Sequence, residues 1–335
     1  MPESPDRIVA LANGFKPAMA VLSAVELDLF TALGDDAVDI EELRARIGIA
    51  ARGARDFFDA LVALGLLVRD ADGRYANTAE TASYLDRRKP GYMGGELNHL
   101  NSRVYALWHA LPRALRTGQP QDGVAASAHF PTLFSDEATL DNFVRAMTAA
   151  ALPVAAALAE RFAWRDYRSF LDIGTSQGCV PVRIVQKHAH IAGVGFDLPH
   201  LKPLFDRYVA QHGLSNRLRF VAGDVFTDSL PTADVVVLGR VLHNWDLPAK
   251  QRLLRKAHEA LPSGGAVIVH EHFIDDDRRV GTVGLLASLN MLIMTAGGFD
   301  FSVADCKAWM AEAGFHHMRV EPLAAGQAMV VGRKP

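Results

Sequence analysis

Four short motifs between residues 171 and 246 decide how this chain folds: LDIGTSQG (171–178), GFDLP (195–199), GDVF (223–226) and GRVLHNW (239–245). The first three each mark the point where an apolar, strand-like run ends. In an open parallel sheet the carboxyl ends of the strands meet at one crevice, where ligands bind. The motifs therefore predict a nucleotide-like cofactor in this crevice and place His243 beside it.

Strand-like and helix-like segments alternate from residue 169 onward, which predicts an α/β domain with a doubly wound, Rossmann-like sheet. The tail differs, because the extended runs 317–323 and 327–334 flank Ala-Ala-Gly and predict a closing antiparallel hairpin. The expected strands are 169–174, 192–197, 218–222, 234–239 and 266–272, and the expected helices are 180–188, 200–213 and 248–261.

The first 95 residues have the pattern of a winged-helix module. Helical spacing of apolar residues covers 17–34, 40–48 and 54–67, and two short extended runs then flank Asp72-Gly73. Such modules often bind DNA, but this segment carries 11 Lys and Arg against 15 Asp and Glu. DNA phosphates are negatively charged and are bound by an excess of Lys and Arg, which this segment lacks. We therefore predict a homodimer interface here and no nucleic-acid partner.

Two longer helices, 96–118 and 135–162, are predicted to link this module to the sheet. Ser135 is the expected N-cap of the second helix, Pro153 is a candidate kink, and residues 118–132 read as a connector. The predicted domains are 1–95 for dimerisation, 96–162 for the linking helices and 163–335 for cofactor binding and catalysis.

Composition limits the class of protein. The chain has 335 residues, of which 50% are hydrophobic and 22% charged, with a net charge of −3. These values are typical of a globular protein of two domains.

Cys179 and Cys306 suit a reducing cytosol and form no disulfide or metal framework. MPESPDR lacks the features of a signal peptide, and 283–296 is too short to span a bilayer. A cytoplasmic protein without a membrane partner is expected.

The first two motifs suit a nucleotide. Gly174 and Gly178 permit a tight turn that brings the backbone close to a ligand, although ordinary strand-to-helix turns also contain glycine. A carboxylate at Asp197 can accept both hydroxyls of a ribose, a feature shared by binders of NAD and of S-adenosylmethionine (SAM). A solvated acid at a strand end is the alternative for Asp197.

Asp224 and Phe226 distinguish the two cofactors better. An acid after the third strand can bond the adenine amino group, and the apolar Val225 and Phe226 can sandwich the ring. Core packing is the alternative for Phe226. A ribose acid together with an adenine acid is a SAM-binding arrangement. With the closing hairpin, it favours a class I SAM methyltransferase over a dinucleotide-dependent dehydrogenase.

Residues 15–335 resemble the plant-type small-molecule O-methyltransferases, the caffeic acid, acetylserotonin and bacterial polyketide-tailoring group. VLHNW (241–245) is similar to the family's LHDW, and the N-terminal segment is similar to its dimerisation domain. The resemblance implies SAM as the cofactor and His243 as the catalytic base. It also implies two flanking acids, Glu271 in VHEHF and Asp300 in GGFDF, where the family has GGxER.

Elementary chemistry agrees with a histidine base. A neutral phenol, with a pKa of about 10, is a poor nucleophile at pH 7, and a histidine with an ordinary pKa of about 6.5 can remove its proton. A carboxylate on the other ring nitrogen would fix the tautomer. The alternative for His243 is a surface or capping residue. His270 and His272 flank Glu271 but alternate to the opposite face of the strand, so we predict no metal site.

Several residues depart from the family pattern. Ser176 stands where the family has the middle glycine of the first motif, and Asn244 stands where it has the aspartate of LHDW. Gly239 occupies the position of a cofactor-contacting lysine, a role that the adjacent Arg240 could take over. Asp300 is shorter than the family's glutamate, and Phe301 follows it in place of an arginine. The predicted cofactor residues are Gly174, Gly178, Asp197, Leu198, Gly223, Asp224, Val225, Phe226, Gly239, Arg240 and Trp245.

By position in the family, Phe143, Met147, Asn290, Met291 and Thr295 are predicted to line the acceptor pocket. The alternative for Phe143 and Met147 is ordinary packing within a helix. The sequence thus predicts a homodimeric, SAM-dependent O-methyltransferase that acts on the phenolic hydroxyl of a small aromatic or polyketide-type molecule. Rival hypotheses are C-methylation or SAM-assisted decarboxylation or hydroxylation on the same fold, a winged-helix regulator that senses a ligand, and an NAD-dependent dehydrogenase.

Overall fold

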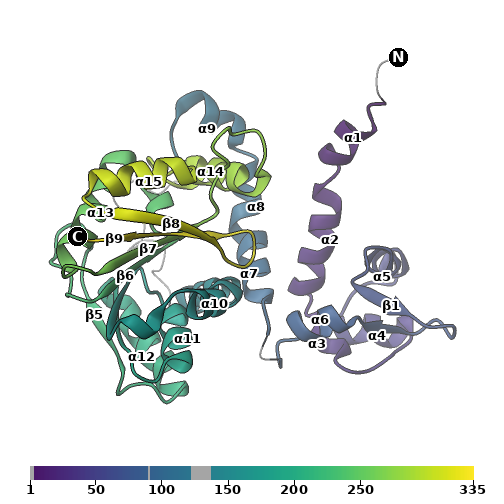
Figure 1. Cartoon of the computed structure of the whole chain (residues 1–335). Helices are drawn as coiled ribbons and strands as arrows, with labels where there is room; N and C mark the ends of the chain where they lie inside the picture. The colour runs from purple at the N-terminus through teal and green to yellow at the C-terminus, as the bar shows by residue number, and fades with distance from the viewer. Residues whose placement is uncertain (1–3, 90, 122–136) are drawn as a thin grey trace. The chain divides into compact units, whose positions relative to one another are not determined.

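The computed structural model describes residues 4–89, 91–121 and 137–335. The chain divides into two compact units (Figure 1). One comprises the described residues up to Ala106 together with Arg145–Ala149, and the other comprises the remaining described residues.

The first unit has the helices and hairpin of the predicted winged-helix module. Segment 17–34 forms two helices rather than the expected one, because Asp28 adopts a left-handed φ of 56° that interrupts the helical path. The elements are α1 (Asp6–Ala12), α2 (Phe15–Glu26), α3 (Leu29–Leu33), α4 (Ile40–Ile47), α5 (Ala54–Ala63), β1 (Leu67–Arg69), β2 (Tyr75–Asn77) and α6 (Ala79–Tyr84).

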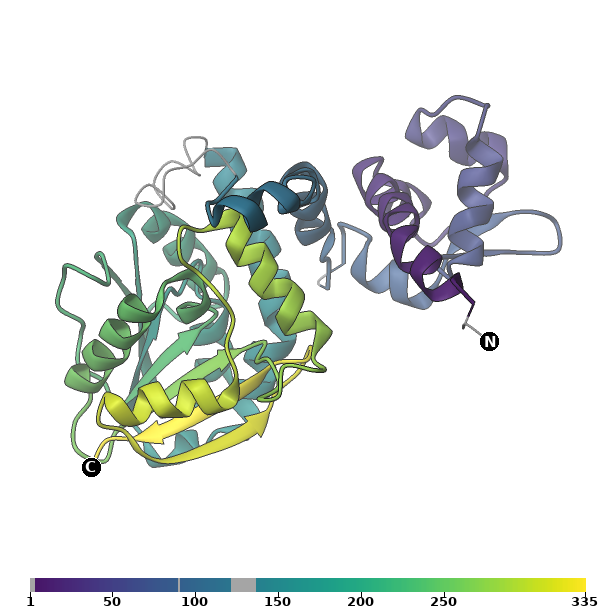
Figure 2. The same cartoon turned by 90° about the horizontal axis from the view of Figure 1, so that it is seen from above.

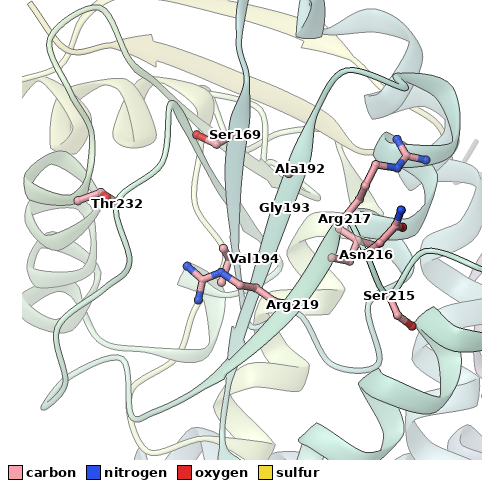
Figure 3. A pocket seen from close by; sticks show the side chains of 10 residues that line it. Ser169, Ala192, Gly193, Val194, Ser215, Asn216, Arg217, Arg219 and Thr232 are labelled. Atoms are coloured by element: carbon pink, nitrogen blue, oxygen red, sulfur yellow. The ribbon is translucent and has the colours of Figure 1, made fainter.

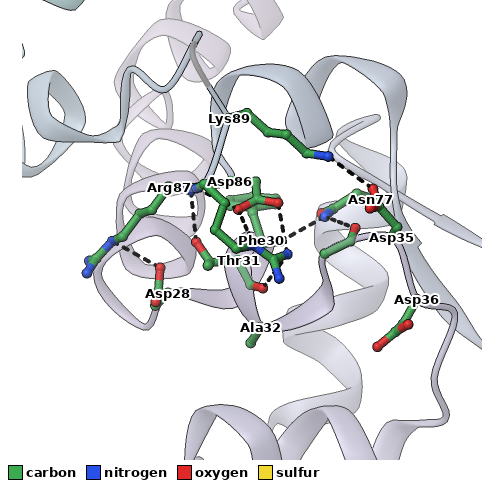
Figure 4. Close-up of polar contacts among 12 residues, drawn as sticks. Asp28, Phe30, Thr31, Ala32, Asp35, Asp36, Asn77, Asp86, Arg87 and Lys89 are labelled. Carbon is green, nitrogen blue, oxygen red and sulfur yellow. Dashed lines mark hydrogen bonds and ion pairs between the residues drawn. The ribbon is translucent and has the colours of Figure 1, made fainter. Parts of the chain in front are cut away.

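A polar cluster secures the segment after α6 to α3 in this unit (Figure 4). The side chain of Asp86 is fully buried and accepts two hydrogen bonds from the guanidinium of Arg88, at 3.0 and 2.9 Å. Arg88 also donates to the carbonyl of Thr31, and the Asn77 amide donates to the carbonyls of Phe30 and Gly34. These bonds add side-chain donors to carbonyls in the last turn and C-cap of α3, where the helix itself runs out of N–H groups.

The expected helix at 96–118 is broken into several pieces. They are α7 (Gly94–His99), the π-helical segment η1 (Leu100–Val104), α8 (Tyr105–Trp108) and α9 (Leu111–Thr117). Pro112 lies in the first turn of α9, where its missing N–H costs nothing, and a new helix therefore begins there. Helix α10 (Glu137–Arg161) contains Pro153 and matches the second expected helix. The predicted cap Ser135 and most of the connector 118–132 lie outside the described residues.

The second unit contains a seven-stranded sheet in the order β5-β4-β3-β6-β7-β9-β8 (Figures 1 and 2). Strands β3 to β7 are parallel, and β8 and β9 form the predicted antiparallel hairpin at one edge. The strands are β3 (Ser169–Ile173), β4 (Ala192–Asp197), β5 (Leu218–Ala222), β6 (Val235–Gly239), β7 (Ala266–Glu271), β8 (His316–Pro322) and β9 (Ala328–Arg333).

Helices cover both faces of this sheet. Val235, Val237 and Ile268 pack against α10, α11 (Cys179–Lys187) and α12 (Lys202–Gln211), whereas Val236 and Leu238 pack against α13 (Leu247–Ala260) and α15 (Val303–Glu312). Because both faces of the central strands are buried, polar side chains that must meet a ligand are placed at the strand ends. Helix α14 (Thr282–Met294) and the short turns η2 (Trp164–Asp166), η3 (Pro199–Leu201) and η4 (Leu242–Asn244) complete this unit.

The buried carboxylate in the first unit gives a stability prediction. Replacing Asp86 by Asn removes the charge that Arg88 pairs with, and we expect the free energy of unfolding to fall by about 1–3 kcal/mol in urea denaturation. The control is Glu41→Gln, which breaks the exposed Glu41–Arg44 pair and should cost less than about 1 kcal/mol. Equal losses in the two variants would contradict this account of the Asp86 cluster.

Candidate active site

The loop between β3 and α11 has the conformation that its glycines allow. Gly174 and Gly178 have φ angles of 73° and 93°, and Ser176 adopts a left-handed φ of 52° between them. A Cβ at Gly174 would lie 2.7 Å from Cγ2 of Val241, so this position has no room for a side chain. The backbone N–H of Ser176 donates to Oδ2 of Asp197 at 2.9 Å, which links this loop to the end of β4.

Two carboxyl groups lie at this end of the sheet, Asp197 partly buried and Asp172 buried. Asp197 accepts a second hydrogen bond from the N–H of Leu198 at 2.8 Å, and burial raises the pKa of Asp197 to about 6. Asp172, inside β3, is 4% exposed, and burial raises its pKa to about 7. We did not select Asp172 from the sequence, although an acid within an otherwise apolar strand is a visible signal.

The GDVF motif forms a tight turn after β5. The N–H of Phe226 donates to Oδ1 of Asp224 at 2.7 Å, and the N–H of Asp224 donates to Asp228. The ring of Phe226 meets that of Trp245 edge to face, with centroids 4.6 Å apart. Gly223 is buried, and Val225, Phe226 and Trp245 are only partly buried beside the core. Phe226 thus packs against a neighbour while part of its surface stays exposed.

Gly239 is explained by its partner in the sheet. It pairs with His270 of β7, and a Cβ at Gly239 would overlap with Nε2 of His270. Nδ1 of His270 contacts Oε1 of Gln327 at 3.1 Å, and the amide nitrogen of Gln327 contacts His272 at 3.3 Å. Burial lowers the pKa of His270 to about 4, so this imidazole is neutral at pH 7. A lysine side chain at position 239 has no space here, and the cation available is the adjacent Arg240.

The structure brings His243, Glu271 and Asp300 together, and all three are buried. His243 lies in the η4 turn after β6, Glu271 ends β7, and Asp300 lies in the segment before α15. Nδ1 of His243 is 3.4 Å from Oδ1 of Asp300. Oε1 of Glu271 instead accepts the backbone N–H of His243 at 3.4 Å. The shorter acid therefore contacts the imidazole, and the longer acid holds the turn that carries it.

These three side chains form one cluster: a ring nitrogen of His243 and one carboxylate oxygen each of Glu271 and Asp300 all lie within 4.8 Å of one another. Burial raises the pKa of Glu271, and the nearby carboxylate of Asp300 acts in the same direction. The absence of a metal site stays a prediction from the sequence. Oε2 of Glu271 and Oδ2 of Asp300 are buried without a hydrogen-bond partner within the described chain.

Helix α14 places the predicted acceptor residues next to this cluster. Ser288 Oγ accepts the backbone N–H of Asp300 at 3.1 Å, so α14 also fixes the acid. Oδ1 of Asn290 accepts a hydrogen bond from the indole of Trp108 at 3.1 Å, and Trp108 is a neighbour that sequence reasoning missed. The Thr295 hydroxyl donates to the carbonyl of Met291 and accepts the N–H of Gly298, and these two hydrogen bonds close the turn after the helix. The side chain of Phe143 lies outside the described residues, and Met147 belongs to the first unit, so both remain predictions.

A hollow of about 300 Å³ lies at the opposite end of the strands (Figure 3). Its lining includes Ser169 and Ala192, the first residues of β3 and β4, and Arg217. The guanidinium of Arg217 donates hydrogen bonds to the carbonyls of Val185, His188 and Ala189. The cofactor motifs lie at the carboxyl ends of the same strands. This hollow is therefore distinct from the crevice that the motifs define.

The sheet order, the closing hairpin and the acids after β4 and β5 define a class I SAM-dependent methyltransferase fold. Comparisons with known proteins give the family. Residues 108–316 match the O-methyltransferase domain, and residues 9–87 match the O-methyltransferase dimerisation domain. The chain belongs to this family of SAM-dependent O-methyltransferases, which act on small molecules.

Individual relatives cover almost the whole chain. The tetracenomycin polyketide synthesis 8-O-methyl transferase TcmO of Streptomyces glaucescens is 40% identical over 99% of this chain and 97% of its own length. The N,N-dimethyltransferase OxyT of Streptomyces rimosus is 35% identical over 98% and 96%. The crystal structure of human N-acetylserotonin methyltransferase in complex with SAM superposes with a TM-score of 0.91 at 26% identity, covering 99% of this chain and 98% of that one.

The contact between Gly239 and His270 is directly testable. Gly239→Ala forces a methyl group into the space of the His270 ring, and we expect a loss of about 1–3 kcal/mol in the free energy of unfolding. The double variant Gly239→Ala/His270→Ala removes the overlap and should recover part of that loss. Additive losses in the double variant would show that the ring does not exclude a side chain at position 239.

Proposed function

We propose that this enzyme transfers the methyl group of SAM to a phenolic hydroxyl of an aromatic, polyketide-type acceptor, with His243 as the general base. The observation that carries the proposal is the buried contact between His243 and Asp300 at the end of β6, beside the cofactor motifs. The 40% identity to a polyketide O-methyltransferase supports the class of acceptor.

The residues of the crevice fit SAM. Ser176 Oγ, in the loop after β3, is buried without a hydrogen-bond partner in the described chain. A ligand here would satisfy this hydroxyl group. We propose that Asp197, with Leu198 beside it, takes the ribose hydroxyls, that Asp224 and Phe226 hold adenine, and that Asp172 faces the ammonium of the methionine portion. Gly174, Gly178 and Gly223 let the backbone approach, and Arg240 and Trp245 border the site.

The chain's residues prepare the acceptor oxygen. When bound, SAM supplies a methyl group on a positively charged sulfur. Nε2 of His243 takes the proton of the acceptor hydroxyl while Asp300 holds Nδ1, which fixes the tautomer and stabilises the imidazolium. The oxygen then gains the methyl group, the bond from carbon to sulfur breaks, and the electron pair stays on sulfur. A methyl ether and S-adenosylhomocysteine result, and the imidazolium returns its proton to solvent. Much of the acceleration comes from alignment of the reacting atoms.

The apolar surface of the first helices suits a second copy of the chain. Ile8, Leu11 and Phe15 are more than half exposed on α1 and α2. The stretch Asp6–Glu26 is long and apolar enough to cross a membrane, with 17% of the window buried. Because residues 9–87 match a dimerisation domain, we assign this surface to a homodimer in the cytoplasm, without a membrane or nucleic-acid partner.

N-methylation is a second candidate, because OxyT, at 35% identity, is named an N,N-dimethyltransferase. A screen of phenols and of matched aromatic amines for S-adenosylhomocysteine release distinguishes the two. Product mass spectrometry then locates the added methyl group. It also detects C-methylation, and products that gain oxygen or lose a carboxyl group.

The base assignment predicts separate effects of three substitutions. His243→Gln should lower kcat by about 10²- to 10⁴-fold while leaving the affinity for SAM nearly unchanged, because the proposed ribose and adenine contacts, Asp197 and Asp224, follow other strands. Asp300→Asn should lower kcat less, and Glu271→Gln should act mainly on the stability of the η4 turn. Isothermal titration with SAM and steady-state kinetics measure these effects. A fully active His243→Gln enzyme would refute the base.

The raised pKa of Asp197 predicts a pH dependence of cofactor binding. The ribose hydroxyls donate to the ionised carboxylate, whose pKa in the unliganded protein is about 6. The affinity for SAM should therefore be constant well above pH 6 and should fall as the pH drops through about 6. Titrations from pH 5 to 8 measure this effect, and Asp197→Asn should abolish the dependence. An identical pH dependence in that variant would exclude Asp197 as its source.

A further inference from the structure

Lys250 is a fully buried lysine next to the catalytic cluster. It lies in the first turn of α13, and its exposed fraction is 0%. Lysine normally extends its ammonium to water, so a lysine with no exposed surface requires partners inside the protein. It shares the inward face of α13 with Leu253, Leu254 and Ala257, which all belong to the core.

Two backbone carbonyls receive the ammonium. Nζ of Lys250 donates to the carbonyl oxygen of Trp245 at 2.6 Å and to that of Phe299 at 2.9 Å. Trp245 follows the turn that carries His243, and Phe299 directly precedes Asp300. Lys250 is 5 residues from Trp245 and 49 residues from Phe299 along the chain, so one ammonium joins two segments that are distant in sequence.

Aromatic rings enclose the same ammonium. Nζ lies 3.1 Å from the ring centroid of Phe299, 5.4 Å from that of Phe301 and 5.9 Å from that of Trp309. Such rings attract a cation and exclude water, so the charge acts on its neighbours through a medium of low dielectric constant.

The titratable groups that face Lys250 come from every element around it. They are Glu271 of β7, Asp300 of the segment before α15, and Asp246, the N-cap of α13. Cys306 of α15 faces Glu271, and burial raises the pKa of its thiol. Burial lowers the pKa of Lys250 to about 7, against the opposing effect of the three carboxylates. Glu271 and Asp300 are the carboxylates that contact His243.

We propose that Lys250 is a positioning residue of the active site: its ammonium joins the His243 turn to the Asp300 segment and places a positive charge beside Glu271 and Asp300. The inference rests on the proposed role of His243 as base and adds a residue that touches neither substrate nor cofactor. A lysine that merely filled space could be exchanged for methionine without changing the pH profile.

The main experiment compares three variants by pH–rate profile, kcat and KM with the best phenol from the screen. Lys250→Met keeps the unbranched side chain and removes the charge, Lys250→Arg keeps the charge, and Arg255→Met removes an exposed charge from the same helix as the control. For Lys250→Met we expect kcat to fall about 10- to 100-fold, with the affinity for S-adenosylhomocysteine nearly unchanged.

The direction of the pH shift follows from the charge. Loss of a nearby positive charge makes every group in the cluster easier to protonate, so the acidic limb of the profile moves to higher pH, by about one unit. Lys250→Arg should keep the limb near its original pH, and Arg255→Met should change neither kcat nor the limb. A Lys250→Met enzyme with lower thermal stability but an unchanged kcat and acidic limb would overturn the proposal, as would an arginine variant shifted as far as the methionine variant.

A stability measurement keeps the proposal testable if Lys250→Met folds poorly. Glu271→Gln removes one of the two negative charges left without compensation, so the double variant Lys250→Met/Glu271→Gln should have a higher Tm than Lys250→Met alone. Additive losses of Tm would contradict the charge coupling. This cycle needs no substrate, so it separates failure of the Lys250 proposal from failure of the proposed methylation of phenols.

Discussion

Burial of both faces of the central sheet is the constraint on which the rest of this structure depends. Val235 to Leu238 in β6 and Ala266 to Val269 in β7 are completely enclosed, so no side chain within them can meet a ligand. Chemistry is confined to the points where the strands end, and the parallel order brings those ends to one edge. Asp197, Gly239 and Glu271 are the last residues of β4, β6 and β7 for this reason.

Local patterns were sufficient to predict most of the fold. The apolar strands, the Asp-Gly hairpin and the closing hairpin each depend on residues adjacent in sequence, and the structure confirms them. The two longer helices differ in outcome for a physical reason. Residues 137–161 form one helix, α10, which packs on the sheet, whereas 96–118 is interrupted by a π-helical segment and by Pro112. Asp28 likewise ends a helix through its own backbone angle, which periodicity does not encode.

The candidate site was predictable in its membership but not in its contacts. His243, Glu271 and Asp300 follow from motifs, yet which acid reaches the imidazole depends on how the segment before α15 packs on α14. Ser288 fixes the backbone of Asp300 there, and this contact spans 12 residues. Gly239 illustrates the same limit, because the reason for the glycine is a histidine on the neighbouring strand. Lys250 has the sequence context of an ordinary exposed lysine, and only tertiary packing turns it inward.

The charges around His243 suggest why a buried cation belongs there. Glu271 and Asp300 lie beside the imidazole, and their proximity and burial raise the pKa of Glu271. The ammonium of Lys250 is held next to both segments by the carbonyls of Trp245 and Phe299, where a positive charge offsets part of the negative charge of these acids. A carboxylate beside His243 favours the imidazolium that forms when the histidine takes the proton of the acceptor. The buried lysine therefore supports the acids in that role from a position that touches neither substrate nor cofactor.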